Sequence, residues 1–100
     1  MKRAIVLEET RHDLSSLEMQ GYEIVWLMPP QREYTDPAIY QDMLNAVRKI
    51  GFDYRQDAVV CAGGHLQMWR LAAVMEQEFG EYDVLFWNSE RKAYDRLSLY

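Results

Sequence analysis

The sequence has little cysteine and no long hydrophobic run. A single cysteine, Cys61, excludes an internal disulfide and any zinc site built from several cysteines, and a lone thiol suits a reducing compartment. No apolar stretch approaches the ~20 residues that a membrane-spanning helix needs. The first residues, MKRAIVLEE, become acidic too soon for a signal peptide. We therefore expect a cytoplasmic protein without a membrane partner.

Basic residues are also few, because 11 Lys and Arg stand against 16 Asp and Glu, which gives a formal net charge of -5. Direct nucleic-acid binding needs a basic face that displaces counterions, so this charge balance argues against it. The sequence lacks HExxH and CxxC patterns and the GxSxG elbow of serine hydrolases. We accordingly predict neither a metal site nor a cofactor.

What the chain does contain is material for one hydrophobic core. It has 100 residues, of which 49% are hydrophobic and 13% aromatic. This length matches one domain, and this composition excludes intrinsic disorder. We treat residues 1–100 as a single domain.

Short apolar runs alternate with helical patterns along the chain. Residues 4–7 are continuously apolar, as is typical of a strand buried on both faces. Asp36 and Pro37 form a helix start, and apolar residues then recur at spacings of three and four up to Gly51. The same criteria give the full set of expected elements, which are strands at residues 4–7, 22–28, 58–62 and 83–87 and helices at residues 11–20, 37–50 and 66–79.

The tail, residues 88–100, fits two interpretations. Ala93, Tyr94 and Leu97 match the spacing of a helix, whereas Leu97 and Leu99 alternate as in a strand that returns along the sheet. We favour the helix.

A helix between each pair of strands favours parallel pairing through right-handed crossovers. The sequence therefore predicts an α/β fold: a small doubly wound, Rossmann- or flavodoxin-like, four-stranded parallel sheet with helices on both faces and an extra C-terminal helix or strand. The simplest strand order is 2-1-3-4. In such sheets, ligands bind at the carboxyl ends of the strands where the winding direction reverses, here between the first and third strands.

The most specific local feature at that edge is Gly63-Gly64-His65, between a strand and a helix. Two glycines let an anion approach the backbone N–H groups at the helix start. The segment is neither a Walker loop nor a complete GxGxxG motif, and a tight turn explains the glycines equally well. His65 is a candidate hydrogen-bond donor, general base or stacking ring, or simply a residue that caps its own turn.

The other loops at this edge supply further candidates. Arg32 offers a planar fork for phosphate or carboxylate, and Tyr34 offers a stacking face. Glu8 is a carboxylate for ribose hydroxyls or acid/base work, although dipole compensation at a helix start also explains it. Three more residues complete the candidate ligand-binding set, namely Thr10, Asn88 and Arg91.

Several conspicuous residues have a structural interpretation instead. Trp69 lies at core spacing on the third helix, and Trp26 and Trp87 lie inside strands, so we expect all three in the core. Nothing near Cys61 indicates a lowered pKa, and we expect a small buried apolar residue there.

These observations favour a domain that binds a small molecule, most directly a nucleotide or another anionic, phosphate-bearing ligand, without catalysis. So short a chain has little room to enclose a ligand, which favours a homo-oligomer. One alternative is an enzyme that processes nucleotides or phosphoesters, with His65 or Glu8 as acid/base. Another is an acidic adaptor or inhibitor that binds proteins through the cluster Glu76, Glu78, Glu81 and Asp83.

Overall fold

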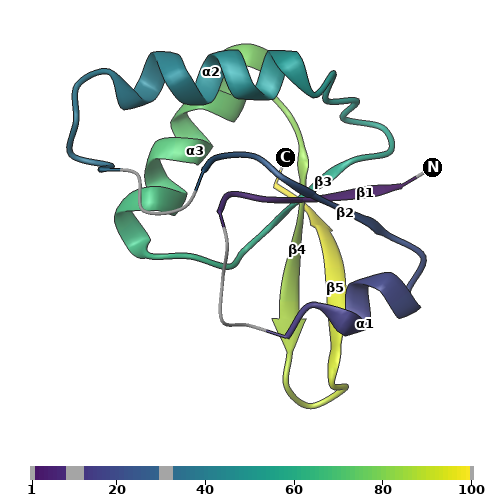
Figure 1. Cartoon of the computed structure of the whole chain (residues 1–100). Helices are drawn as coiled ribbons and strands as arrows, with labels where there is room; N and C mark the ends of the chain where they lie inside the picture. Colours follow the sequence, from purple (N-terminus) through teal and green to yellow (C-terminus); the bar gives the residue numbers. More distant parts are fainter. Residues whose placement is uncertain (1, 9–12, 30–32, 100) are drawn as a thin grey trace.

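One sheet runs through the molecule, with helices on both of its faces (Figure 1). The computed structural model describes residues 2–8, 13–29 and 33–99. The strands are β1 (Arg3–Val6), β2 (Glu23–Trp26), β3 (Ala58–Val60), β4 (Asp83–Asn88) and β5 (Ala93–Ser98). The helices are α1 (Ser15–Met19), α2 (Ile39–Lys49) and α3 (His65–Phe79). In these ranges, no helix has the length and apolar character needed to cross a bilayer.

The sheet order is β2-β1-β3-β4-β5, so the predicted order of the first four strands agrees with the structure. Those four strands are parallel, and β5 is antiparallel to β4. The architecture is thus mixed α/β, with a mostly parallel five-stranded sheet rather than the predicted sheet of four.

Our preference for a C-terminal helix is wrong, because the tail forms β5. Asn88 nucleates the turn: its side-chain oxygen accepts the N–H groups of Glu90 (3.0 Å) and Arg91 (3.2 Å). Lys92 then adopts a positive φ of 52°. The returning strand hydrogen-bonds an edge of β4 that would otherwise be unpaired, and this long-range pairing outweighs the local helical spacing.

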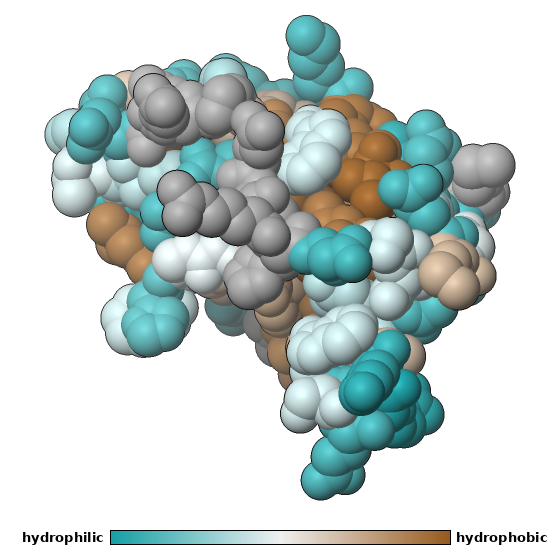
Figure 2. Space-filling view, turned by 60° about the horizontal axis from the view of Figure 1, so that its bottom comes forward, coloured by the Kyte–Doolittle hydropathy of each residue, from teal (hydrophilic) through white to brown (hydrophobic). Residues whose placement is uncertain are grey.

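Different helices pack on the two faces of the sheet. α2 and α3 pack over one face on a large apolar cluster that includes Ile5, Met43 and Met75. The opposite face carries a smaller cluster that includes Val6, Leu17 and Leu85, and α1, with 5 residues, is its helix. Figure 2, which brings the α1 side forward, still shows hydrophobic surface there beside hydrophilic groups. The α1 side is therefore the thinner layer.

The prediction that the tryptophans belong to the core is wrong. The exposed fractions are 49% for Trp26, 76% for Trp69 and 46% for Trp87. Trp69 lies on the solvent side of α3, whose buried positions are Leu71, Val74 and Met75. Trp26 and Trp87 lie near the ends of their strands and are only partly covered.

Candidate functional site

At the predicted ligand edge, two of the described candidate residues are in direct contact. Glu8 follows β1 and Tyr34 lies in the loop after β2, and the Tyr34 hydroxyl donates a hydrogen bond to Glu8 Oε2 at 3.2 Å. Tyr34 is 4% exposed, so its ring is a packed element and not a free stacking face. Thr10 and Arg32 lie outside the described residues.

The glycine turn leads directly into α3. Gly64 is the N-cap residue, and no side chain caps it; the first turn of α3 contains no acidic residue. A Cβ at Gly64 would lie 2.2 Å from Gln67 Oε1, so a side chain there would displace that amide. His65, the first residue of the helix, is exposed. The start of α3 thus presents backbone N–H groups and the positive end of a 15-residue helix dipole.

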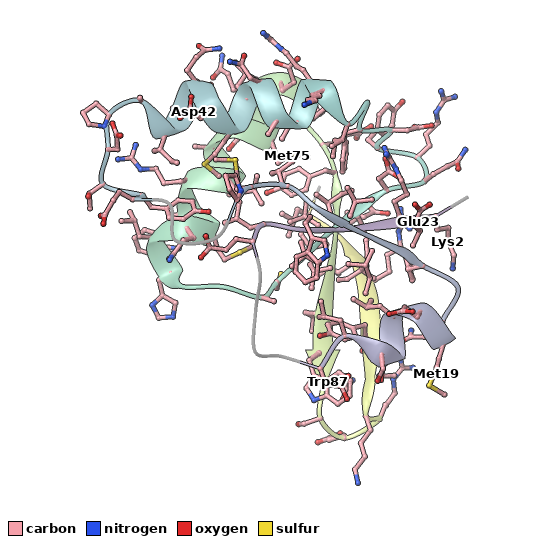
Figure 3. The ribbon with its side chains drawn as sticks, viewed as in Figure 1. Lys2, Met19, Glu23, Asp42, Met75 and Trp87 are labelled. Carbon is pink, nitrogen blue, oxygen red and sulfur yellow. The ribbon has the colours of Figure 1, made fainter. Side chains whose placement is uncertain are left out.

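A pocket of about 360 Å³ lies at the same edge of the sheet, on its α1 side. Its described lining comes from four elements or their flanks: Asp13, Ser16, Cys61, Ala62, Trp87 and Tyr94. Trp87 and Tyr94 form its aromatic part, with ring centroids 5.2 Å apart and an interplanar angle of 69°. Figure 3 shows Trp87 beside the lower part of β4, on the side where α1 lies. Since Ala62 directly precedes the glycine turn, the pocket and the start of α3 are neighbours along the chain.

Among the described lining residues, the charge comes from Asp13. The backbone N–H of Ser15 donates to Asp13 Oδ1 at 2.9 Å, and hydrogen bonds from Ser15 hold the pKa of Asp13 below its usual value. Burial and then the negative charge of Asp13 raise the pKa of Tyr94. At neutral pH the described lining therefore provides one ionised carboxylate, which accepts hydrogen bonds, and one neutral phenol.

The expectation that Cys61 is buried is wrong. Cys61 is exposed, and it lines the pocket. Partial burial of the sulfur raises the pKa of its thiol. The thiol is accordingly protonated at neutral pH, which makes it a weak nucleophile. Its place in the pocket gives it a packing role toward any occupant.

Two predicted site residues have structural partners at the tip of the β4–β5 hairpin. The Asn88 amide donates to Asp95 Oδ2 at 2.8 Å, in addition to its turn bonds. Arg91 forms an ion pair with Asp95 Oδ1. These contacts account for both residues without a ligand.

Sequence reasoning did not select Asp13, Ser16 or Tyr94. Tyr94 reaches the pocket only because β5 returns beside β4, and the helix interpretation of the tail concealed this. The one available indication was the position of Asp13, which follows the first strand along the chain as Glu8 does. Among the described residues, no three His, Cys, Asp or Glu side chains are grouped as metal ligands.

Comparison of the chain with protein-family models, curated proteins and solved structures finds no match.

Proposed function

We propose that this chain is a cytoplasmic small-molecule-binding domain with a doubly wound, flavodoxin-like topology, and that its ligand is a nucleotide. The observation that carries the proposal is the aromatic pocket at the carboxyl edge of the sheet, next in sequence to the uncapped start of α3. This is where open α/β sheets bind ligands.

The two halves of a nucleotide match the two parts of this site. The base stacks on Trp87, and its N–H groups or the ribose hydroxyls donate to the Asp13 carboxylate. The phosphate lies at the Gly63-Gly64 turn, where backbone N–H groups and the dipole of α3 favour an anion. The negative charge of Asp13 disfavours a phosphate inside the pocket, so the orientation of the ligand is defined.

Binding without catalysis remains our preference over the enzyme hypothesis. Glu8 is engaged by Tyr34, and the raised pKa of Cys61 leaves the pocket without a thiolate nucleophile. The adaptor hypothesis is weakened because two of its four acids are paired within the chain: Glu78 with Arg48 at 3.0 Å and Asp83 with Arg96 at 2.6 Å.

Isothermal titration with adenosine, guanosine, their monophosphates and inorganic phosphate tests the proposal. We expect the monophosphate to bind more tightly than its nucleoside. Trp87→Ala should weaken nucleotide binding by about tenfold or more, as loss of a stacked base does. Trp69→Ala is the matched control, since Trp69 is exposed but does not line the pocket.

Three results would contradict the proposal: no binding of any of these probes, equal affinity for nucleoside and monophosphate, or equal effects of the two tryptophan variants. Chemical change of the nucleotide after prolonged incubation would move the assignment to the enzyme hypothesis.

A further inference from the structure

The two edge strands of the sheet, β5 and β2, differ in what bonds their outward main-chain groups. At the β5 edge, the Gln20 side chain bonds the outward main-chain groups of Tyr94: Oε1 accepts the Tyr94 N–H at 3.0 Å, and Nε2 donates to the Tyr94 C=O at 2.9 Å. A side-chain amide thus takes the place of a neighbouring strand. At the other edge, β2 has β1 as its strand partner among the described residues.

The register of β2 on β1 defines which groups face outward. The Glu23 N–H donates to the Lys2 C=O at 3.0 Å, and the Leu27 N–H donates to the Val6 C=O at 2.8 Å. Alternate residues of a parallel strand bond to the same neighbour, so Val25 bonds to β1 as well. The N–H and C=O groups of Ile24 and Trp26 therefore point away from the sheet.

The side chains of these same two residues form an incompletely covered apolar surface. Ile24 packs against the α1-side cluster and Val25 against the opposite one, which places Trp26 on the α1 side with Ile24. Trp26 is 49% exposed. Next to Ile24 lies a groove of about 590 Å³, lined by Glu18, Gly21, Tyr22, Glu23 and Ile24.

We propose that two copies of this chain associate by antiparallel pairing of their β2 strands about a twofold axis at Val25. This register places Ile24 of each copy opposite Trp26 of the other. It also makes each Ile24–Trp26 pair a hydrogen-bonded pair, as their outward N–H and C=O groups require, and makes Val25–Val25 the intervening non-hydrogen-bonded pair.

The same register fills the groove. Trp26 of one copy stands beside Ile24 of the other, and so enters the hollow that Ile24 and Tyr22 border. Its indole N–H needs an acceptor when covered, and the Glu18 carboxylate lies in that lining. A twofold axis repeats this contact, so both tryptophans are covered at once.

Neighbouring registers fit less well. An axis at Ile24 would place Trp26 opposite Tyr22, which is only 7% exposed, and would form no Ile24–Trp26 pair. An axis at Trp26 would place Ile24 opposite Met28 and leave the groove without an indole. With the axis at Val25, Glu23 lies opposite Leu27 at the margin of the pairing, and no two like charges face each other.

The contact is small. Four main-chain hydrogen bonds and two Ile–Trp pairs bury less than the ~1,600 Å² of a standard stable interface. We therefore expect a dimer in reversible exchange with monomer, with a dissociation constant in the micromolar range. The inference does not depend on the proposed ligand, because β2 is not part of that pocket.

Sedimentation equilibrium over a concentration series tests the dimer. We expect a mass that rises from monomer to dimer with concentration, and a dissociation constant at least tenfold higher for Trp26→Lys, because a charge on an edge strand opposes pairing. Trp69→Lys, which places the same charge at another exposed tryptophan, should leave it unchanged. A wild-type chain that stays monomeric, or equal effects of the two variants, would overturn the proposal.

Disulfide trapping tests the register, and it also serves if Trp26→Lys does not fold. In a Cys61→Ser background, Val25→Cys should form a covalent dimer on mild oxidation, because Cα atoms of a non-hydrogen-bonded pair lie about 4.5 Å apart. Glu23→Cys is the control, since its two copies would be about 14 Å apart along the strands. Trapping that is no faster for Val25→Cys than for Glu23→Cys would overturn the proposed pairing.

Discussion

Arg3 and Asp57 form a two-point ion pair between β1 and the turn that precedes β3. Arg3 Nη2 lies 2.6 Å from Asp57 Oδ2, and Arg3 Nε lies 3.1 Å from Oδ1. Asp57 is 1% exposed and also accepts the Asp53 N–H at 2.8 Å. Two further Arg3 N–H groups bond the carbonyls of Ile50 and Gly51, so one guanidinium joins β1, the end of α2 and this turn.

Asp57→Asn should lower the free energy of unfolding by about 2–4 kcal/mol, because it leaves the Arg3 charge partly buried without its counterion. Urea denaturation followed by circular dichroism measures this. Arg55→Gln is the control: Arg55 pairs with Asp53 at 3.5 Å on the surface, and its loss should change stability by less than about 0.5 kcal/mol. An Asp57→Asn variant with the same free energy of unfolding as the wild type would contradict the structural role of the pair.

The lowered pKa of Asp57 predicts that the stability of the protein depends on pH. Burial acts to raise the pKa of Asp57, but the hydrogen bonds from Arg3 and Asp53 and the charge of Arg3 outweigh it and hold this pKa below its usual value. The stabilisation is therefore present above the unfolded pKa of about 4 and is lost as the pH falls through the folded pKa. The stability difference between wild type and Asp57→Asn should shrink between pH 6 and pH 2 in urea titrations. A difference that is constant over this range would refute the assignment.

Asn88→Ala should destabilise the β4–β5 hairpin. The variant removes the acceptor for two turn N–H groups and the donor to Asp95, at a cost of about 1–3 kcal/mol. Thermal unfolding measures the effect, and Ser89→Ala at the exposed neighbouring position is the control. Equal melting temperatures for Asn88→Ala and wild type would show that the turn does not depend on this side chain.

Gln20→Ala should expose the outward main-chain groups of Tyr94 to solvent. We expect faster hydrogen exchange at the Tyr94 N–H and a loss of about 1–2 kcal/mol in unfolding free energy. Met19→Ala is a suitable control, because Met19 is 86% exposed at the adjacent position. Unchanged exchange at Tyr94 in Gln20→Ala would mean that Gln20 does not protect this edge.

The sequence predicted those parts of the fold that depend on the local pattern of residues. Apolar runs located the four parallel strands, and crossover geometry gave their order. The predicted helix start at Asp36 and Pro37 is slightly early: α2 begins at Ile39 with Ala38 as its N-cap, and the Asp36 carboxylate instead accepts the Ala38 N–H at 2.9 Å in the preceding turn. These features depend on residues close together in the chain.

The errors arose where a distant part of the chain decides the outcome. Spacing predicts which residues share a face, but it does not predict whether another element covers that face. Trp69 has core spacing on α3, yet its side faces solvent, and α1 is too short to cover Trp26 and Trp87 completely. The pocket was missed for the same reason, because Tyr94 joins Trp87 only through the hairpin.

The bond between Gln20 and Tyr94 also constrains the order of folding. It joins residues 74 positions apart, so the loop that it closes is among the longest in the molecule and carries a high entropic cost early in folding. β5 must first pair with β4, and only then are the Tyr94 groups positioned for the amide. The contact between Gln20 and Tyr94 is therefore expected to form late in folding, after the β4–β5 hairpin.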